Sequence, residues 1–73
     1  MIRIEVDTPE EKLHVMDLLY PHPCVVYTVE KNIDVYCDRF VQMKYSNSDE
    51  YLSRFDAEKQ ALRHDPDVVL IEK

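Results

Sequence analysis

Glycine is absent from this chain, and cysteine is scarce, with two residues among 73. Without glycine the sequence contains neither a Gly-rich phosphate-binding loop nor a dinucleotide-binding fingerprint. Any backbone position that needs a positive φ must then be taken by Asn32, Asn47 or an aspartate. Two cysteines are also too few for a disulfide scaffold. These absences exclude two nucleotide-binding motifs and the small disulfide-rich class of protein.

Long apolar runs and basic residues are also lacking. No run approaches the length of a membrane span, and the charged start MIRIEVD is unlike a signal peptide, so we expect a cytoplasmic protein. Nine basic residues face fifteen acidic ones, for a net charge of −6. That balance repels nucleic acid and anionic lipid and favours a basic partner. The length predicts a single domain over residues 1–73, with a shallow binding surface.

Two clear elements open the chain. Alternation of apolar and charged residues predicts a half-buried strand over residues 1–7. A helix follows, because Thr8 can act as its N-cap, Pro9 fits its first position, and Glu11 completes a capping box. The prolines of PHP, at 21 and 23, end this helix. Its predicted buried positions are Leu13, Met16 and Leu19 or Tyr20.

The middle of the chain is rich in β-branched residues and tyrosine. Residues 24–30 and 33–45 are predicted to be two strands of a hairpin, with Lys31 and Asn32 as its turn. This register sets Val26 opposite Cys37 and Tyr27 opposite Tyr36. A shift of one residue would exchange the two faces and bury the aromatic rings instead.

The last part of the chain predicts a second helix and a final strand. Asn47 or Ser48 would cap the helix, and its buried stripe would be Leu52, Phe55 and Leu62. Residues 67–73 form a continuous apolar run, which suggests a strand buried on both faces.

The element order βαββαβ is typical of an α+β, ferredoxin-like two-layer sandwich, with both helices on one face of the sheet. That fold makes the first and third strands central, whereas here the fourth strand is the most apolar. A variant strand order therefore remains open.

Catalytic and metal chemistry have little support in the sequence. His22 and Cys24 are two residues apart and Cys37 lies alone, which matches no standard zinc spacing, so we expect no metal and no cofactor. A disulfide is disfavoured because the predicted register sets Cys37 opposite Val26. Cys24 and His22 form the only nucleophile–base pair, without an oxyanion-hole motif. We therefore expect a protein that is not an enzyme.

Acidic and aromatic residues are the better candidates for a binding site. In the predicted hairpin, Asp34, Tyr36 and Asp38 share one face with Tyr27 and Phe40. Carboxylates at fixed spacing on a rigid surface can imitate the phosphates of DNA, whereas an RNA-binding sheet would need a basic surface. Acids at helix starts also have an ordinary capping role. The predicted partner-binding residues are Asp34, Asp38, Glu10, Glu11, Asp49, Glu50, Tyr27 and Tyr36.

In its size, its compact opening MIRIEVDTPEEK and its acid-rich surface, the chain resembles the small acidic proteins with which lytic bacteriophages take over their host. Among these it is most similar to DNA-mimic inhibitors of the histone-like HU nucleoid protein. The resemblance implies a phage-encoded, non-enzymatic inhibitor that acts in the host-cell cytoplasm and presents carboxylates to a basic host DNA-binding protein. From the net charge we expect direct contact with neither nucleic acid nor a membrane. The alternative is a small ferredoxin-like regulatory module that binds a small ligand or forms a homodimer through its sheet.

Overall fold

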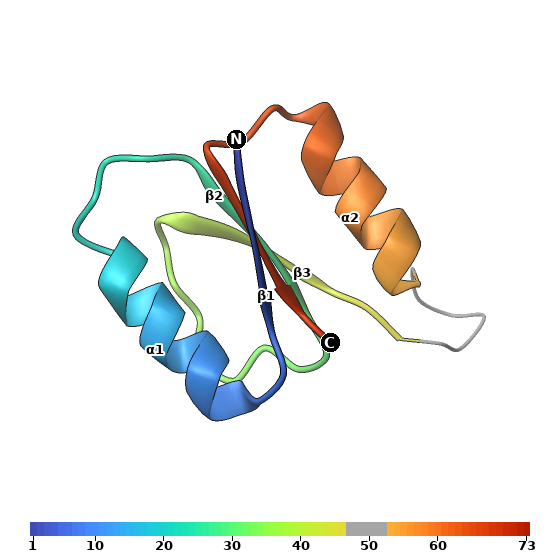
Figure 1. The fold of residues 1–73 in the computed structure, drawn as a ribbon, viewed down its shortest axis with the longest axis horizontal. Helices are drawn as coiled ribbons and strands as arrows, with labels where there is room; N and C mark the ends of the chain where they lie inside the picture. The colour runs from blue at the N-terminus through green and yellow to red at the C-terminus, as the bar shows by residue number, and fades with distance from the viewer. Residues whose placement is uncertain (47–52) are drawn as a thin grey trace.

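The computed structural model describes residues 1–46 and 53–73, which form one four-stranded sheet and two helices. The strands are β1 (Ile2–Val6), β2 (Val26–Glu30), β3 (Phe40–Lys44) and β4 (Val68–Glu72), and the helices are α1 (Pro9–Leu19) and α2 (Arg54–Arg63). The predicted element order, βαββαβ, is confirmed. Across the sheet the order is β1-β4-β2-β3, and each neighbouring pair is parallel (Figure 1).

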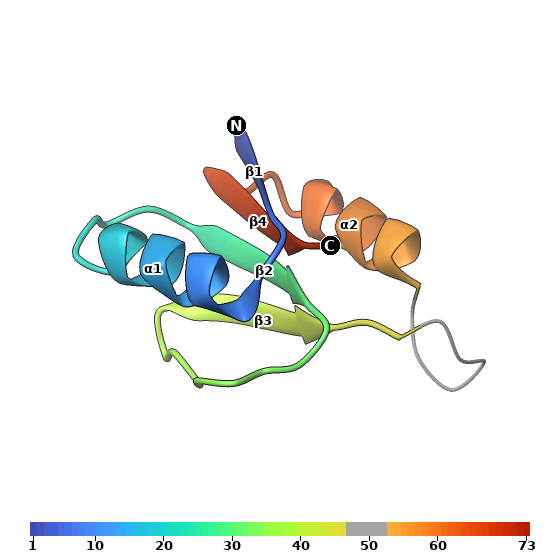
Figure 2. The same ribbon diagram turned by 60° about the horizontal axis from the view of Figure 1, so that its bottom comes forward.

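The two helices lie on opposite faces of the sheet (Figures 1 and 2). Met16 of α1 packs in a core cluster with Leu70 of β4, whereas Ala57 of α2 packs in a second cluster with Val69. Neighbouring residues of β4 thus pack in different core clusters, because successive side chains of a strand point to opposite faces of the sheet. The expectation of two helices on one face of a ferredoxin-like sheet is therefore wrong, and the chain adopts a variant strand order.

The hand of the connections explains this arrangement. The chain moves in one direction across the sheet from β1 to β2 and on to β3, and it returns in the other direction from β3 to β4. Parallel crossovers are almost always right-handed, so a reversal of direction moves the connection to the opposite face. Accordingly, α1 and residues 31–39 share one face, where Asp34 bonds to Lys12 and Cys37 packs on the core of α1, and α2 covers the other.

The interior position of β4 confirms the prediction from its apolar run. All five residues of β4 are buried, and the strand pairs with β1 on one side and β2 on the other. β1 confirms the predicted alternation in part. Val6 is buried and Ile4 packs on the same core, while Arg3 and Glu5 are exposed on the α2 face and Ile2 at the strand's start is 60% exposed.

The predicted hairpin is wrong. β2 and β3 are parallel, with Val26 opposite Phe40 and Tyr27 opposite Val41, and residues 31–39 cross between them without a strand of their own. Tyr27 therefore lies on the α2 face, stacked on His64 at 5.3 Å between ring centroids. Tyr36, its predicted partner, lies in the crossover on the other face and is 82% exposed.

The helix ends follow the capping signals where these are described. Thr8 Oγ1 accepts a hydrogen bond from the Glu11 backbone N–H at 3.1 Å, which confirms the N-cap of α1. α2 begins later than predicted, with Ser53 as N-cap, and Asn47 and Ser48 fall outside the described residues. Neither helix in the described ranges is long and apolar enough to cross a membrane.

The buried side of α2 also differs from the prediction. Ala57 and Ala61 are fully buried, whereas Phe55 is 67% exposed and Leu62 is 38% exposed. Ala57 and Ala61, one turn apart, form the side of α2 that packs on the sheet. Leu52, the third predicted position, lies outside the described residues. At the C-terminal end, Asp65 takes a positive φ of 48°, the only such residue in the described ranges, and thus replaces the glycine that often ends a helix.

Candidate functional site

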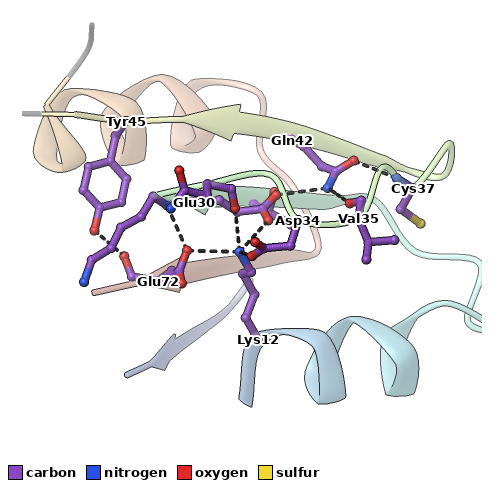
Figure 3. A network of polar contacts seen from close by, with 11 residues as sticks. Lys12, Glu30, Asp34, Val35, Cys37, Gln42, Tyr45 and Glu72 are labelled. Carbon is purple, nitrogen blue, oxygen red and sulfur yellow. Dashed lines mark hydrogen bonds and ion pairs between the residues drawn. The ribbon is translucent and has the colours of Figure 1, made fainter. Parts of the chain in front are cut away.

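A buried lysine connects α1 to the carboxyl ends of β2 and β4. Lys12 lies one turn before Met16 on the inner side of α1, and its side chain is fully buried. Its Nζ lies 3.1 Å from Glu30 Oε1 and 3.1 Å from Glu72 Oε1 (Figure 3). Both glutamates end their strands, and the strands are neighbours in the sheet. The network therefore lies at the carboxyl ends of β2 and β4, on the α1 face of the sheet.

The same lysine fixes the crossover formed by residues 31–39. Lys12 Nζ donates to the backbone oxygen of Asn32 at 2.7 Å and to Asp34 Oδ2 at 2.8 Å. Gln42 of β3 holds the far part of the crossover, because its amide donates to Val35 O and its carbonyl accepts from the Cys37 N–H, both at 2.7 Å (Figure 3). Residues 31–39 are therefore anchored to α1 by the buried Lys12 and to β3 by the half-buried Gln42.

Further hydrogen bonds satisfy the carboxylates of this network. Glu30 Oε2 accepts from Thr28 Oγ1 at 2.6 Å and from Gln42 Nε2 at 3.0 Å, while its Oε1 makes only the ion pair with Lys12. Burial alone would lower the pKa of Lys12, but hydrogen bonds to Asp34, Glu30 and Glu72 outweigh it and raise that pKa above its ordinary value. The ammonium therefore remains charged at neutral pH.

A groove runs between α1 and the anchored crossover. It has a volume of about 640 Å³, within the range typical of binding pockets. Its walls are lined by Leu13, His14, Met16, Asp17, Tyr20, Val35, Tyr36, Cys37, Asp38 and Phe40. Most of these residues are apolar, and the two aspartates are exposed. No lysine or arginine is among the described residues that line the groove.

The structure brings some of the predicted site residues together and separates others. Tyr36 and Asp38 both line the groove, and Asp34 lies on the same crossover but is bonded to Lys12. Asp34 and Asp38 do not stand on a strand face, because residues 31–39 form no strand. Tyr27 is remote from them, on the α2 face.

The acids at the helix starts have different outcomes. Glu10 and Glu11 are exposed in the first turn of α1, where Glu11 takes part in the capping interaction with Thr8. Asp49 and Glu50 lie outside the described residues. The predicted set is thus not one continuous surface in the part of the chain that the structure describes.

The cysteines and histidines form no site of their own. Cys24 and Cys37 are free thiols, half-buried and packed against the core cluster on the α1 face. Within residues 1–46 and 53–73, no group of three or more His, Cys, Asp or Glu side chains is arranged to hold a metal ion. Around Lys12, where three carboxylates meet, the ammonium takes the central position.

Sequence reasoning missed Lys12, Glu30, Glu72 and Gln42 as structural determinants. Two signals were available. Lys12 precedes Met16 by four residues, so it falls on the predicted buried stripe. The apolar runs VYTVE and VVLIE each end in glutamate, which would suggest a shared polar edge once the strands are known to be parallel. The second signal could not be used because β2 and β3 were predicted to be an antiparallel hairpin.

In comparisons with known proteins, no family model, curated protein or solved structure matches the chain. The case for its function therefore rests on the geometry of its own residues.

The raised pKa of Lys12 predicts a loss of stability at alkaline pH. A raised folded-state pKa stabilises the protein fully below the unfolded pKa of about 10.4, and this stabilisation is lost as the pH rises through the folded value. Measurement of the ¹³Cε resonance of Lys12 from pH 9 to 12, in the folded protein and in urea, should show later titration when folded. The free energy of unfolding should fall over the same pH range. Titration of Lys12 at lower pH in the folded protein would contradict the proposed network.

Proposed function

We propose that the protein binds a basic partner protein through the groove between α1 and residues 31–39. The observation that carries this proposal is an apolar groove with exposed aspartates, lined also by Tyr36, which is 82% exposed. Exposed aromatic rings beside polar groups are typical of interaction hot spots. The function is thus non-enzymatic recognition.

Charge supports the choice of a basic partner. Asp17 and Asp38 flank the groove, and the chain as a whole carries a net charge of −6. Arg39, next in sequence to Asp38, does not line the groove; its guanidinium lies 4.7 Å from the centroid of the Tyr20 ring and donates to the Tyr20 backbone oxygen at 2.8 Å. An acidic rim around an apolar floor fits a segment that combines lysine or arginine with aliphatic side chains, and long-range attraction would speed its association.

The HU-type nucleoid protein is the first partner to test, since the resemblance to phage DNA-mimic inhibitors suggests it. In this proposal the rim aspartates bind the lysines and arginines that otherwise contact DNA phosphates. Each face of the sheet carries a helix, so the alternative of a homodimer through the sheet would use its outer strands, β1 or β3.

Displacement of fluorescent DNA from purified HU-type protein tests this function. The wild-type protein should lower the DNA anisotropy, and Tyr36→Ala or Asp38→Lys should weaken this competition roughly 10- to 30-fold, since a hot-spot residue contributes about 2 kcal/mol. Val25→Ala and Asp7→Lys are controls, since both residues are exposed and neither lines the groove. DNA that stays bound, or groove variants that compete as well as the controls, would refute the proposal.

A further inference from the structure

A second cavity lies at the carboxyl edge of the sheet, and its lining is basic. Its volume is about 670 Å³, and its described walls are lined by Lys31, Asn32, Lys44, Tyr45, Ser46, Ser53, Arg54, Phe55 and Lys73. Four of the nine lysines and arginines of the chain are in this set. No aspartate or glutamate is among these described lining residues. In a protein with a net charge of −6, the overall composition would not lead one to expect a cavity lined by four bases.

The position of the cavity in the fold is also typical of a ligand site. Residues 31–39 leave β2 toward the α1 face, whereas the chain that leaves β3 leads to α2 on the opposite face. In open parallel sheets, ligands bind outside the carboxyl ends of neighbouring strands whose connections diverge in this way. Lys31 follows β2, Lys44 ends β3, and Lys73 follows β4. The bases therefore meet at the topological switch point.

The α2 helix adds hydrogen-bond donors directed at the same place. Its first residues, Arg54 and Phe55, line the cavity, and the first N–H groups of a helix have no acceptor within the helix. Ser53 Oγ already accepts from the Asp56 N–H at 3.1 Å, so the donors of Arg54 and Phe55 are the relevant ones. The positive end of the helix dipole and the basic side chains favour the same kind of ligand, an anion.

The existing contacts of these bases show what holds the cavity in place. Lys31 donates its backbone N–H to Glu72 Oε1 at 2.8 Å. The Tyr45 hydroxyl donates to Glu72 O at 2.7 Å (Figure 3). Arg54 is a hydrogen-bond partner of the Tyr45 side chain, and Lys73 pairs with Glu5 at 2.9 Å. The buried network around Lys12 thus fixes one wall of the basic cavity.

We infer that this cavity binds a small phosphate-bearing molecule. Lys31, Arg54 and the start of α2 would hold the phosphate, and the exposed ring of Phe55 offers an apolar surface to the organic part. Phosphate is favoured over a carboxylate because several bases and N–H groups converge, which suits a doubly charged group with three acceptor oxygens. Side chains here take the role that a Gly-rich loop has in other phosphate sites.

Titration of the ¹⁵N-labelled protein at constant ionic strength tests the inference. Inorganic phosphate and adenosine monophosphate should both shift the amides of Lys31, Tyr45, Arg54 and Phe55 in a saturable way, and the nucleotide should bind more tightly. Adenosine, which lacks the phosphate, should leave these amides unshifted. Shifts that do not saturate, an absence of shifts with both phosphate compounds, or equal binding of adenosine would overturn the inference.

Charge variants identify the residues that bind. Lys31→Gln and Arg54→Gln should each weaken binding of adenosine monophosphate about tenfold, as expected for loss of one charge-assisted hydrogen bond. Arg63→Gln, at the other end of α2 and outside the cavity, removes the same charge and should leave binding unchanged. A spectrum that keeps its dispersion shows that each variant is folded. Equal weakening by Arg63→Gln would show nonspecific attraction and would refute the site.

Discussion

Replacing Lys12 with methionine is expected to lower the free energy of unfolding by about 3–5 kcal/mol. The substitution keeps most of the side-chain volume but leaves Glu30 and Glu72 buried without the ammonium between them. It also removes the two bonds that anchor Asn32 and Asp34. Urea denaturation followed by circular dichroism would measure the loss. A domain of this size has a total stability of about 4–11 kcal/mol, so the variant would lose a large part of it.

Two further variants separate the buried network from general effects of losing a lysine. Lys59→Met changes an exposed lysine of α2 and should alter stability by no more than about 0.5 kcal/mol. The double variant Lys12→Met with Glu30→Gln should be more stable than Lys12→Met alone, because it removes one of the uncompensated buried charges. If Lys12→Met were as mild as Lys59→Met, the network would not hold α1 and the crossover together.

Replacing Leu70 with alanine is expected to lower the free energy of unfolding by about 2–5 kcal/mol. Leu70 is fully buried in β4 and packs in the cluster that contains Val6, Met16 and Val26. Truncation would leave a cavity in the middle of the sheet, since β4 has neighbours on both sides. Chemical denaturation of both proteins gives the difference directly.

Leu18→Ala is the matched control for this core substitution. Leu18 lies on α1 and is 57% exposed, so its truncation should change stability by no more than about 0.5 kcal/mol. The comparison also tests the strand order, because a ferredoxin-like sheet would place β4 at an edge. A loss of less than about 1 kcal/mol for Leu70→Ala would contradict the interior position of β4.

The candidate binding groove contains residues that were predicted from the sequence, in a setting that was not. Tyr36 and Asp38 were both predicted as partner-binding residues, and both line the groove. Their predicted setting on a hairpin face was wrong, since they lie in a crossover that Lys12 and Gln42 anchor. Exposure and charge are properties of single residues and could be predicted. The shape of the groove depends on contacts between α1 and residues 31–39, which no local pattern specifies.

The sequence by itself determined the elements whose signals are local. Thr8 and the prolines after Tyr20 delimit α1, alternation marks β1, and the apolar run of β4 indicates its interior position. Capping and periodicity act over a few residues, so these features can be derived without the fold.

Only the tertiary structure decided the direction in which β2 pairs with β3, the face that each helix covers, and the meeting of Lys12 with Glu72, 60 residues apart in the chain. The groove and the basic cavity depend on the same strand pairing and helix placement. Strand pairing is selected by burial of both sheet faces together and not by any one segment.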